Sequence, residues 1–228
     1  MNNEHFTSFD LKIIAVITMT IDHIGYFLFP DVEWLRVIGR ISFPIFAFLC
    51  AQSYRYTHDK KTYLIRMLIF GTVITIAKYF LNYQVIEADI FITLGLGFAM
   101  LWLSDSKYWY LSFIPLLLGM AINTEYYWFG IVLVPLFYYG EDYKWVYVPG
   151  LLILSYLYVL SSQYFATISY DWFAPVFESS FLQVYCAIAG LFLIWYNKKP
   201  GYQGNKYFFY LYYPLHVIII NVIGMAVK

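Results

Sequence analysis

Apolar runs of near-spanning length fill most of the chain, and short polar joints separate them. A run of about 20 apolar residues is long enough for a helix to cross the hydrocarbon core of a bilayer. The pattern therefore predicts an all-α fold, a polytopic transmembrane helix bundle of about nine spans. Several runs are shorter than about 20 residues, so eight or ten spans are alternatives. The expected ranges are 11–30, 34–54, 62–82, 90–104, 108–122, 127–140, 145–162, 181–197 and 206–227.

The composition supports an integral-membrane protein. Of the 228 residues, 62% are hydrophobic and 12% are charged, whereas soluble domains average about 25% charged residues. No internal repeat, low-complexity tract or soluble segment interrupts the chain, so residues 1–228 are expected to form a single integral-membrane domain. The formal net charge of zero gives no electrostatic footprint for a nucleic-acid partner. Cys50 and Cys186 lie in apolar runs and are expected to be buried packing residues.

The distribution of basic residues predicts the orientation. Cytoplasmic joints carry an excess of Lys and Arg. Residues 1–10 lack the basic region of a secretory signal, so 11–30 is expected to be a retained span. The excess is matched by nine spans with the N-terminus in the cytoplasm and the C-terminus outside. Ten of the fourteen basic residues then lie at cytoplasmic ends: Lys12, Arg55, Lys60, Lys61, Arg66, Lys107, Lys144, Lys198, Lys199 and Lys206.

The first apolar run carries Asp22 and His23 within 11–30. Ionisable groups at membrane depth are costly and indicate a functional site by default. A helix advances about 1.5 Å and 100° per residue, which would put Lys12 and His23 on nearly the same face. The alternative is that Lys12 extends to the headgroups and His23 makes a packing hydrogen bond to a neighbouring helix.

The second run carries Arg36 and Arg40, four residues apart and therefore on one helical face. A short acidic joint makes this run antiparallel to the first, and Asp22 is the expected counterion of Arg40. Arg36 lies nearer the interface, where we expect it to extend toward the headgroups. Pro44 follows Arg40 and should leave a backbone carbonyl unpaired, as in broken helices that line cavities.

The joint YRYTHDKKTYLIR gathers basic side chains on the predicted cytoplasmic side. One interpretation is ordinary positive-inside topology. The other is a phosphate-binding lip, because Arg and Lys suit a polyanionic ligand. Composition does not separate the two. The candidate residues in this joint are Arg55, Lys60, Lys61 and Arg66.

The last run places His216 two residues after Pro214. Tyr212 and Tyr213 precede His216 by four and three residues, so one hydroxyl is expected near the imidazole if Pro214 distorts the helix. The alternative is a hydrogen-bonded core histidine. A metal site is disfavoured, because HxxxH spacing is absent and the cysteines are not clustered. Upstream, the aromatic joint 163–180 is interpreted as a re-entrant or interfacial hairpin.

Three segments carry a resemblance to a known family. LKIIAVITMTIDHIG, LRVIGRISFPIFAFLCAQSYRYT and FFYLYYPLH resemble, in order, the signature blocks of the TraX family, named for an enzyme that acetylates the N-terminus of pilin subunits. More distantly, Asp10, Lys12 and His23 resemble the first helix of integral-membrane acyltransferases that use cytoplasmic coenzyme A. Lys12 stands where those enzymes have Arg, and their following Gly is missing, which weakens any role for Lys12.

The resemblance implies an acetyl-CoA-dependent acyltransferase of the cell (cytoplasmic) membrane. His23 would be the general base, Asp22 the partner of Arg40, and His216 an aid at the acceptor end or at the acyl carbonyl. Arg40 is alternatively a stabiliser of the thioester oxyanion. Lys12, Arg55, Lys60, Lys61 and Arg66 would hold the coenzyme's phosphates, without a metal. The implied partners are the lipid bilayer, a coenzyme A thioester and a peptide or glycan acceptor.

Two other classes explain the same residues. A small secondary transporter or proton-coupled channel would use charged helices, proline breaks and histidines as a proton relay. Transporters commonly show internal repeats and should not bind coenzyme A. A scaffold for a secretion or conjugation apparatus would tolerate replacement of Asp22, His23 and Arg40.

Overall fold

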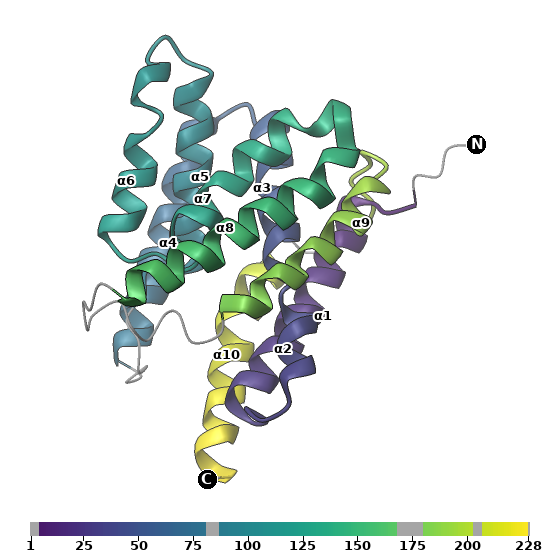
Figure 1. The fold of residues 1–228 in the computed structure, drawn as a ribbon, viewed down its shortest axis with the longest axis vertical. Helices are drawn as coiled ribbons and strands as arrows, with labels where there is room; N and C mark the ends of the chain where they lie inside the picture. Colours follow the sequence, from purple (N-terminus) through teal and green to yellow (C-terminus); the bar gives the residue numbers. More distant parts are fainter. Residues whose placement is uncertain (1–4, 81–86, 168–179, 203–206, 228) are drawn as a thin grey trace. The chain divides into compact units, whose positions relative to one another are not determined.

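The fold is all-helical over the residues that the computed structural model describes, which are 5–80, 87–167, 180–202 and 207–227 (Figure 1). Isolated bridges pair Phe6 with Tyr196 and Ala88 with Thr124. The α-helices are α1 (Ser8–Phe27), α2 (Glu33–Gly39), α3 (Ser42–Tyr56), α4 (Lys60–Phe80), α5 (Ile90–Ser104), α6 (Ile114–Ala121), α7 (Tyr127–Tyr139), α8 (Tyr147–Thr167), α9 (Ile188–Ile194) and α10 (Tyr207–Val227). The 3₁₀-helices are η1 (Trp109–Leu111), η2 (Glu141–Val146) and η4 (Ser180–Ala187).

Each apolar run predicted from the sequence corresponds to a helical segment. Three segments are long and apolar enough to cross a membrane by length and composition: Glu33–Tyr56, Lys60–Phe80 and Glu141–Ser162. Five shorter apolar helices accompany them: Ile90–Ser104, Trp109–Ala121, Tyr127–Tyr139, Phe181–Ile194 and Leu211–Gly224. These helices are those of a membrane helical protein, whereas the span count and the cytoplasmic N-terminus stay predictions.

The second run is broken where α2 ends and α3 begins. The break lies at Arg40 and Ile41, slightly before the site expected from Pro44. Pro44 is the third residue of α3 and therefore lies in its first turn, where backbone N–H groups have no intrahelical partner. The helix thus accommodates the proline, and Arg40 sits at the junction between the two pieces.

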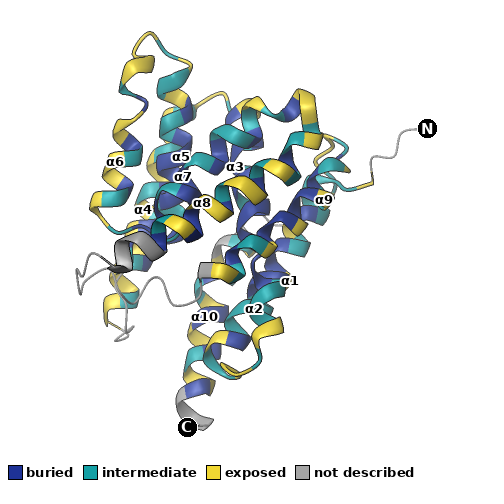
Figure 2. Ribbon diagram, in the orientation of Figure 1, coloured by how far each residue is buried: buried dark blue, intermediate teal, exposed yellow. Residues whose placement is uncertain are grey.

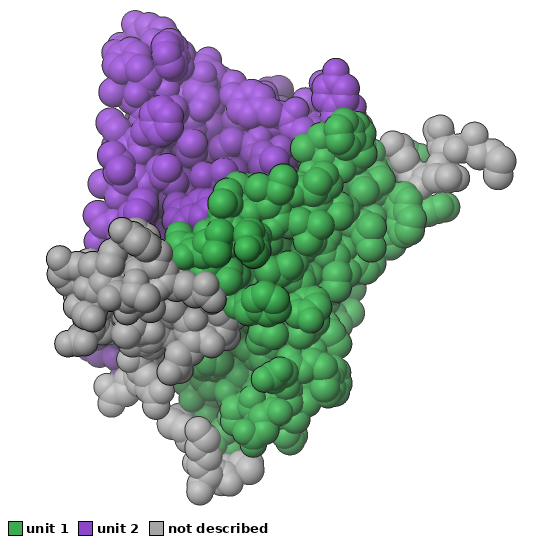
Figure 3. All heavy atoms as spheres, in the orientation of Figure 1, with its two compact units in different colours: residues 1–46, 144–228 green, residues 47–143 purple. Residues whose placement is uncertain are grey.

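Two compact units divide the chain, one of residues 1–46 and 144–228 and the other of residues 47–143 (Figure 3). In the first unit, α1 packs against α2 and α10, and α8 packs against η4 and α9. In the second, α5 packs against α4, α6 and α7. The expectation of one membrane domain over 1–228 stays a prediction.

The start of α1 is tied to the segment that follows α9. The Thr7 hydroxyl accepts a hydrogen bond from the Asp10 backbone N–H, and the Asp10 carboxylate accepts one from the Thr7 backbone in return. The backbone N–H of Ser8 donates to the Lys199 carbonyl at 2.9 Å. This capping box and the backbone hydrogen bond to Lys199 fix where α1 begins. They thereby fix the position of the ionisable residues along this helix.

Small residues bring α5 close to its neighbours. A methyl group added at Gly97 would lie 2.7 Å from a Val134 side-chain carbon on α7, and one at Gly95 would lie 2.9 Å from Leu68 on α4. Small residues of this kind let membrane helices approach one another closely. Both cysteines are buried, as expected.

Exposed residues recur along α8, as the colouring by burial in Figure 2 shows. One side of α4 is likewise exposed, and it is apolar. Exposed aliphatic side chains recur along it at helical spacing, and a contiguous apolar surface of this kind is typical of contact with lipid or with another protein. The residues are Ile65, Ile69, Val73 and Ile76.

Candidate functional site

Asp22 and His23 are neighbours on α1 but face different helices of the first unit. Asp22 is paired with α2 and the α2–α3 junction, and His23 contacts α10. The divergence follows from the rotation of about 100° between consecutive helical residues. α1 therefore carries two different polar contacts at one level.

The carboxylate of Asp22 binds two guanidinium groups. One oxygen lies 2.8 Å from Arg36 Nη1, and the other lies 3.1 Å from Arg40 Nη2. The predicted Asp22–Arg40 pair is thus confirmed. Arg36, expected to extend toward the headgroups, instead pairs with Asp22 and also donates to its backbone carbonyl at 3.1 Å. The i, i+4 spacing of the arginines lets each take one carboxylate oxygen.

Arg40 extends this contact to the 3₁₀-helix η4. Its Nη1 donates to Gln183 Oε1 at 3.3 Å, and its Nε donates to the Arg36 carbonyl at 3.4 Å. Both Arg40 and Gln183 are buried. We call Asp22, Arg36, Arg40 and Gln183 the Asp22 network. Gln183 has no recognisable signal in the sequence, because it lies in an apolar run without neighbouring polar residues.

Gly39 makes room for this network. A Cβ atom at position 39 would overlap the Asp22 carboxylate itself. The position therefore requires glycine for close approach rather than for an unusual backbone angle.

A histidine pair joins α1 to α10. His216 Nε2 lies 3.0 Å from His23 Nδ1, and the ring centroids are 4.9 Å apart. His216 is 6% exposed. The sequence suggests both histidines as site residues, but it gives no indication that they are bonded to each other.

The Tyr212 carbonyl fixes the tautomers of this pair. It lies 2.9 Å from His216 Nδ1, and a carbonyl oxygen only accepts, so His216 Nδ1 carries hydrogen and donates. In the neutral ring, His216 Nε2 then lacks hydrogen and accepts from His23 Nδ1. Neutral His23 is consequently left with its basic lone pair on Nε2.

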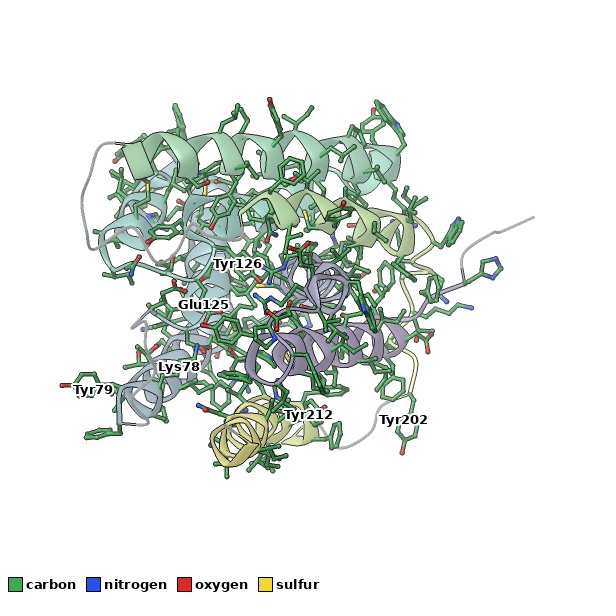
Figure 4. The ribbon with its side chains drawn as sticks, turned by 60° about the horizontal axis from the view of Figure 1, so that its bottom comes forward. Lys78, Tyr79, Glu125, Tyr126, Tyr202 and Tyr212 are labelled. Carbon is green, nitrogen blue, oxygen red and sulfur yellow. The ribbon has the colours of Figure 1, made fainter. Side chains whose placement is uncertain are left out.

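Tyr212 supports His216 differently from the sequence expectation. Its ring stacks on the imidazole, with centroids 5.0 Å apart and planes 12° from parallel. Its hydroxyl lies 2.7 Å from the Thr20 hydroxyl on α1 (Figure 4). Tyr212 therefore meets the imidazole through its ring, while its hydroxyl contacts Thr20.

The candidate phosphate-binding residues fall in both units. Lys12 lies on α1, 5.7 Å from the Phe209 ring centroid. Arg55 pairs with Glu141 at 2.5 Å and also covers the Tyr138 ring, whereas Lys60 lies over the Tyr54 ring. These aromatic contacts are cation–π interactions.

The start of α4 also carries an acidic group. Lys61 and Arg66 are exposed on α4. Asp59 caps this helix, and hydrogen bonds from Thr62 lower the pKa of the Asp59 carboxyl. Part of the positive charge at this end is thereby offset. Lys12 belongs to the first unit and the other four residues to the second, and their joint role stays a prediction.

A second ionic cluster lies in the second unit and has no counterpart among the predicted site residues. Lys78 near the end of α4 pairs with Asp89 at 2.9 Å and with Glu125 (Figure 4). Glu87 adjoins them, and burial together with the Glu125 charge raises the pKa of its carboxyl to about 7. We call these four residues the Lys78 cluster. Asp89 is readable in the sequence as a cap of α5, since an Asp before an apolar run is a helix-start signal.

Glu125 of the Lys78 cluster lies in a constrained turn between α6 and α7. Asn123, Tyr126 and Tyr127 adopt positive φ angles of 55°, 61° and 45°, a left-handed backbone that is costly for side-chain-bearing residues. The Glu125 backbone N–H donates to the Ala88 carbonyl at 3.0 Å, which anchors the turn to the start of α5. The cluster thus joins helix ends.

Two further predictions from the sequence concern the hairpin at 163–180 and a metal site. The predicted hairpin at 163–180 lies mostly outside the described residues, although α8 continues to Thr167 and η4 begins at Ser180. Over the ranges that the structure describes, no group of three His, Cys, Asp or Glu side chains is placed to hold a metal ion.

Comparisons with known proteins agree with the sequence blocks. The family model of the TraX protein matches residues 8–224. A probable fimbrial assembly protein, FimC of serogroup H1 from Dichelobacter nodosus, is 27% identical over 242 aligned positions, covering 96% of each chain. An uncharacterized protein, RP591, from Rickettsia prowazekii is 40% identical over 87 residues, 38% of this chain and 33% of that protein. No solved structure shows a significant match. The match over nearly the whole chain shows that the protein belongs to the TraX family.

Proposed function

We propose that this protein is a membrane-embedded acyltransferase that moves an acetyl group from acetyl-CoA to an amine or hydroxyl acceptor. The observation that carries the proposal is the histidine pair of α1 and α10, 3.0 Å between His216 Nε2 and His23 Nδ1. Membership of the TraX family supports it, and so does a relative named as a fimbrial assembly protein. A pilin-like peptide N-terminus and an envelope glycan are the acceptor classes.

His23 is the general base in this reaction. Its Nε2 takes a proton from the acceptor as the acceptor's nitrogen or oxygen attacks the thioester carbonyl carbon. The carbonyl π electrons move onto oxygen and form a tetrahedral intermediate. Collapse of the intermediate breaks the carbon–sulfur bond, and the proton on His23 neutralises the departing coenzyme A thiolate. Imidazole suits both transfers because its ordinary pKa is near neutrality.

His216 positions this base. It accepts from His23 Nδ1, while its own Nδ1 donates to the Tyr212 carbonyl. The chain of bonds keeps the lone pair of His23 on Nε2 and stabilises the positive charge that develops when that atom takes a proton. This is the role of an orienting group behind a catalytic base.

The Asp22 network holds α1 and α2 in register beside the histidine pair. Asp22 and His23 are consecutive residues of one helix. The two ion pairs of Asp22 therefore also fix the direction in which His23 points around the axis of α1. Asp22 acts here through position, not through direct contact with the imidazole.

The donor is held by its phosphates in this proposal. Arginine and lysine side chains provide charge-assisted hydrogen bonds to phosphate oxygens. The residues assigned to it are Lys12, Arg55, Lys60, Lys61 and Arg66. The protein would act as a multi-pass protein of the cell membrane with its N-terminus in the cytoplasm, the lipid bilayer as its surroundings and no metal in the transfer.

The test is acetyl transfer by the purified protein in lipid nanodiscs. Radiolabelled acetyl-CoA is incubated with the protein and an envelope fraction, and labelled peptide and glycan are then quantified. We expect label on one acceptor class, and a fall of at least about 10²-fold with His23→Ala, typical of the loss of a general base.

The matched control is His5→Ala, which changes an exposed histidine outside the pair. It should keep wild-type transfer. Full transfer by a correctly folded His23→Ala protein would contradict the base assignment, and an absence of labelled product with the wild type would contradict the acyltransferase itself.

A further inference from the structure

Two side-chain hydrogen bonds join α10 to α1, about one helical turn apart. His216 bonds to His23, and the Tyr212 hydroxyl lies 2.7 Å from the Thr20 hydroxyl. Thr20 precedes His23 by three residues, and Tyr212 precedes His216 by four, so each helix carries its two residues on one face. The histidine pair is therefore one of two neighbouring contacts between the same helices.

The direction of the hydroxyl bond follows from the other bond that Thr20 makes. The Thr20 hydroxyl lies 2.8 Å from the Val16 carbonyl, one turn earlier in α1. A carbonyl oxygen only accepts, so the single hydroxyl hydrogen of Thr20 is donated to Val16. The Thr20 oxygen must then accept from Tyr212. The side chain of Tyr212 is thereby tied to α1 through its own hydroxyl hydrogen.

The Tyr212 ring, held in this way, covers one face of the His216 imidazole. The two ring centroids are 5.0 Å apart, and the ring planes are 12° from parallel. An imidazole nitrogen accepts a hydrogen bond in the plane of its ring, so the orientation of that plane decides whether His216 Nε2 meets His23 Nδ1. The torsion that turns the ring is broad in histidine. Stacking on Tyr212 therefore supplies a restraint that the histidine side chain itself lacks.

The backbone of α10 is weakened at the same place. Pro214 lies inside this helix, between Tyr212 and His216. A proline in a helix interior removes one backbone hydrogen bond and disturbs the preceding turn. Side-chain contacts consequently contribute more to the orientation of His216, and the bond from Tyr212 to Thr20 is one of them.

We propose that Tyr212 is a positioning residue for the general base. Its hydroxyl, bonded to Thr20, keeps its ring against His216, and the ring keeps His216 Nε2 directed at His23 Nδ1. The inference rests on the proposed function and extends it, because there Tyr212 contributes only its backbone carbonyl. No bond to the side chain of Tyr212 or Thr20 forms or breaks during transfer.

The competing role for the bond between Tyr212 and Thr20 is to hold the two helices together without any influence on the histidines. The two roles differ in what the loss of a hydroxyl changes. Helix association alone affects the free energy of unfolding, and the molecules that remain folded work at the normal rate. A positioning role changes kcat and the histidine tautomers in folded molecules.

The experiment measures histidine tautomers and acetyl transfer in nanodiscs for the wild type, Tyr212→Phe and Thr20→Val. Isotopically labelled ring nitrogens are observed by NMR at a pH at which the rings are neutral, because NMR distinguishes a nitrogen that carries hydrogen from one that does not. The chain has four histidines. All proteins therefore carry His5→Gln and His58→Gln, which leaves only the signals of the pair.

In the protein with Tyr212 and Thr20 intact, we expect one tautomer for each histidine, with hydrogen on Nδ1. Tyr212→Phe and Thr20→Val should each give mixed tautomers and lower kcat about tenfold, less than a fully displaced group would. The KM for acetyl-CoA should change less than about threefold. Thr20→Ser keeps the hydroxyl and should restore both the tautomers and the rate. The double variant should be no worse than either single one, because both remove the same bond.

The matched control is Tyr196→Phe. The Tyr196 hydroxyl lies 2.9 Å from the Ser8 hydroxyl at the start of α1. This change removes a bond of the same kind to the same helix, about 22 Å from His23 along the helix axis. We expect the unfolding midpoints of Tyr196→Phe and Tyr212→Phe to fall alike, by about 2–4 °C. Tyr196→Phe should keep the wild-type tautomers and the wild-type kcat per folded molecule.

Two results would overturn the positioning role. One is a Tyr212→Phe protein with wild-type tautomers and wild-type kcat, whose unfolding midpoint alone is lowered. The other is an equal loss of kcat in Tyr212→Phe and Tyr196→Phe. If the wild type transfers no acetyl group, the proposed function fails, and the tautomers still decide separately whether Tyr212 orients the histidine pair.

Discussion

The ionic groups of the two compact units have net charges of opposite sign. In the first unit one carboxylate, Asp22, serves two arginines. In the second unit one ammonium group, Lys78, serves Asp89 and Glu125, with Glu87 close by. The Asp22 network thus has an excess of positive charge, and the Lys78 cluster has an excess of negative charge.

Their positions along the helices differ as well. The Asp22 network begins within α1 and lies beside His23, the proposed general base. The Lys78 cluster joins the end of α4, the start of α5 and the turn after α6. The comparison teaches that buried charge alone does not identify a catalytic site. We expect changes in the first unit to alter transfer and changes in the second to alter stability.

The largest effect is expected from Lys78→Met. This substitution removes the cation that Asp89 and Glu125 share, and Asp89 is fully buried. Loss of one partner of a buried pair typically costs 3–5 kcal/mol, so we expect the free energy of unfolding to fall by about 4 kcal/mol. Denaturant unfolding in detergent measures it. Transfer per folded molecule should be unchanged, and its loss would place the Lys78 cluster in the chemistry.

Asp22→Asn should have a somewhat smaller effect on stability and a larger one on transfer. The two arginines lose their counterion, but the Asp22 side chain is 15% exposed and water offsets part of the loss. We expect destabilisation of about 3 kcal/mol and slower transfer per folded molecule, because His23 loses its fixed azimuth. Asp89→Asn is the matched control. Equal transfer by Asp22→Asn and Asp89→Asn would remove the distinction between the units.

Gly39→Ala tests whether the carboxylate needs the space beside α2. The added methyl group overlaps Asp22, and overpacking typically costs 1–3 kcal/mol. We expect a loss of about 2 kcal/mol. Combined with Asp22→Gly, the same substitution should cost less, because the Asp22 side-chain atoms that it overlaps, Cβ included, are gone. Additive effects in this double-mutant cycle, read from unfolding midpoints, would argue against the contact.

The smallest effect concerns the pH dependence of the Lys78 cluster. Burial raises the pKa of Glu87 to about 7, from 4.5 in the unfolded chain. The folded state then binds the proton more tightly, so this group stabilises the fold below pH 4.5 and loses that contribution as pH rises through 7. We expect a loss of about 1–2 kcal/mol across this window, after allowance for partial exposure.

Glu87→Gln provides the comparison, since it cannot titrate. Unfolding midpoints measured from pH 5 to pH 8.5 should fall more steeply for the wild type than for the variant. Parallel curves would show that Glu87 does not take up the proton on folding.

The helices were predictable because hydrophobic run length is a local property of the sequence. The Asp22–Arg40 pair was predictable for a related reason: a short joint forces neighbouring helices to pack antiparallel. Arg36 was assigned wrongly. Its depth near the interface favoured contact with the headgroups, but its position four residues before Arg40 placed it on the face that meets Asp22.

The remaining contacts depend on helices far apart in the chain. His23 and His216 were each identified as unusual polar residues, yet their hydrogen bond requires the packing of α10 against α1. Gln183 and the Lys78 cluster were missed. An isolated Gln gives no periodic signal, and Lys78 at a helix end cannot be distinguished by composition from a residue that sets topology.

The histidine pair also has a consequence for biogenesis. Its members are separated by 193 positions, so the ribosome completes the first long before the second. A nascent chain that has released α1 to α9 from the ribosome contains Asp22, Arg36, Arg40 and Gln183, and it still lacks the partner that sets the tautomer of His23. The proposed base is therefore oriented only after α10 has been synthesised.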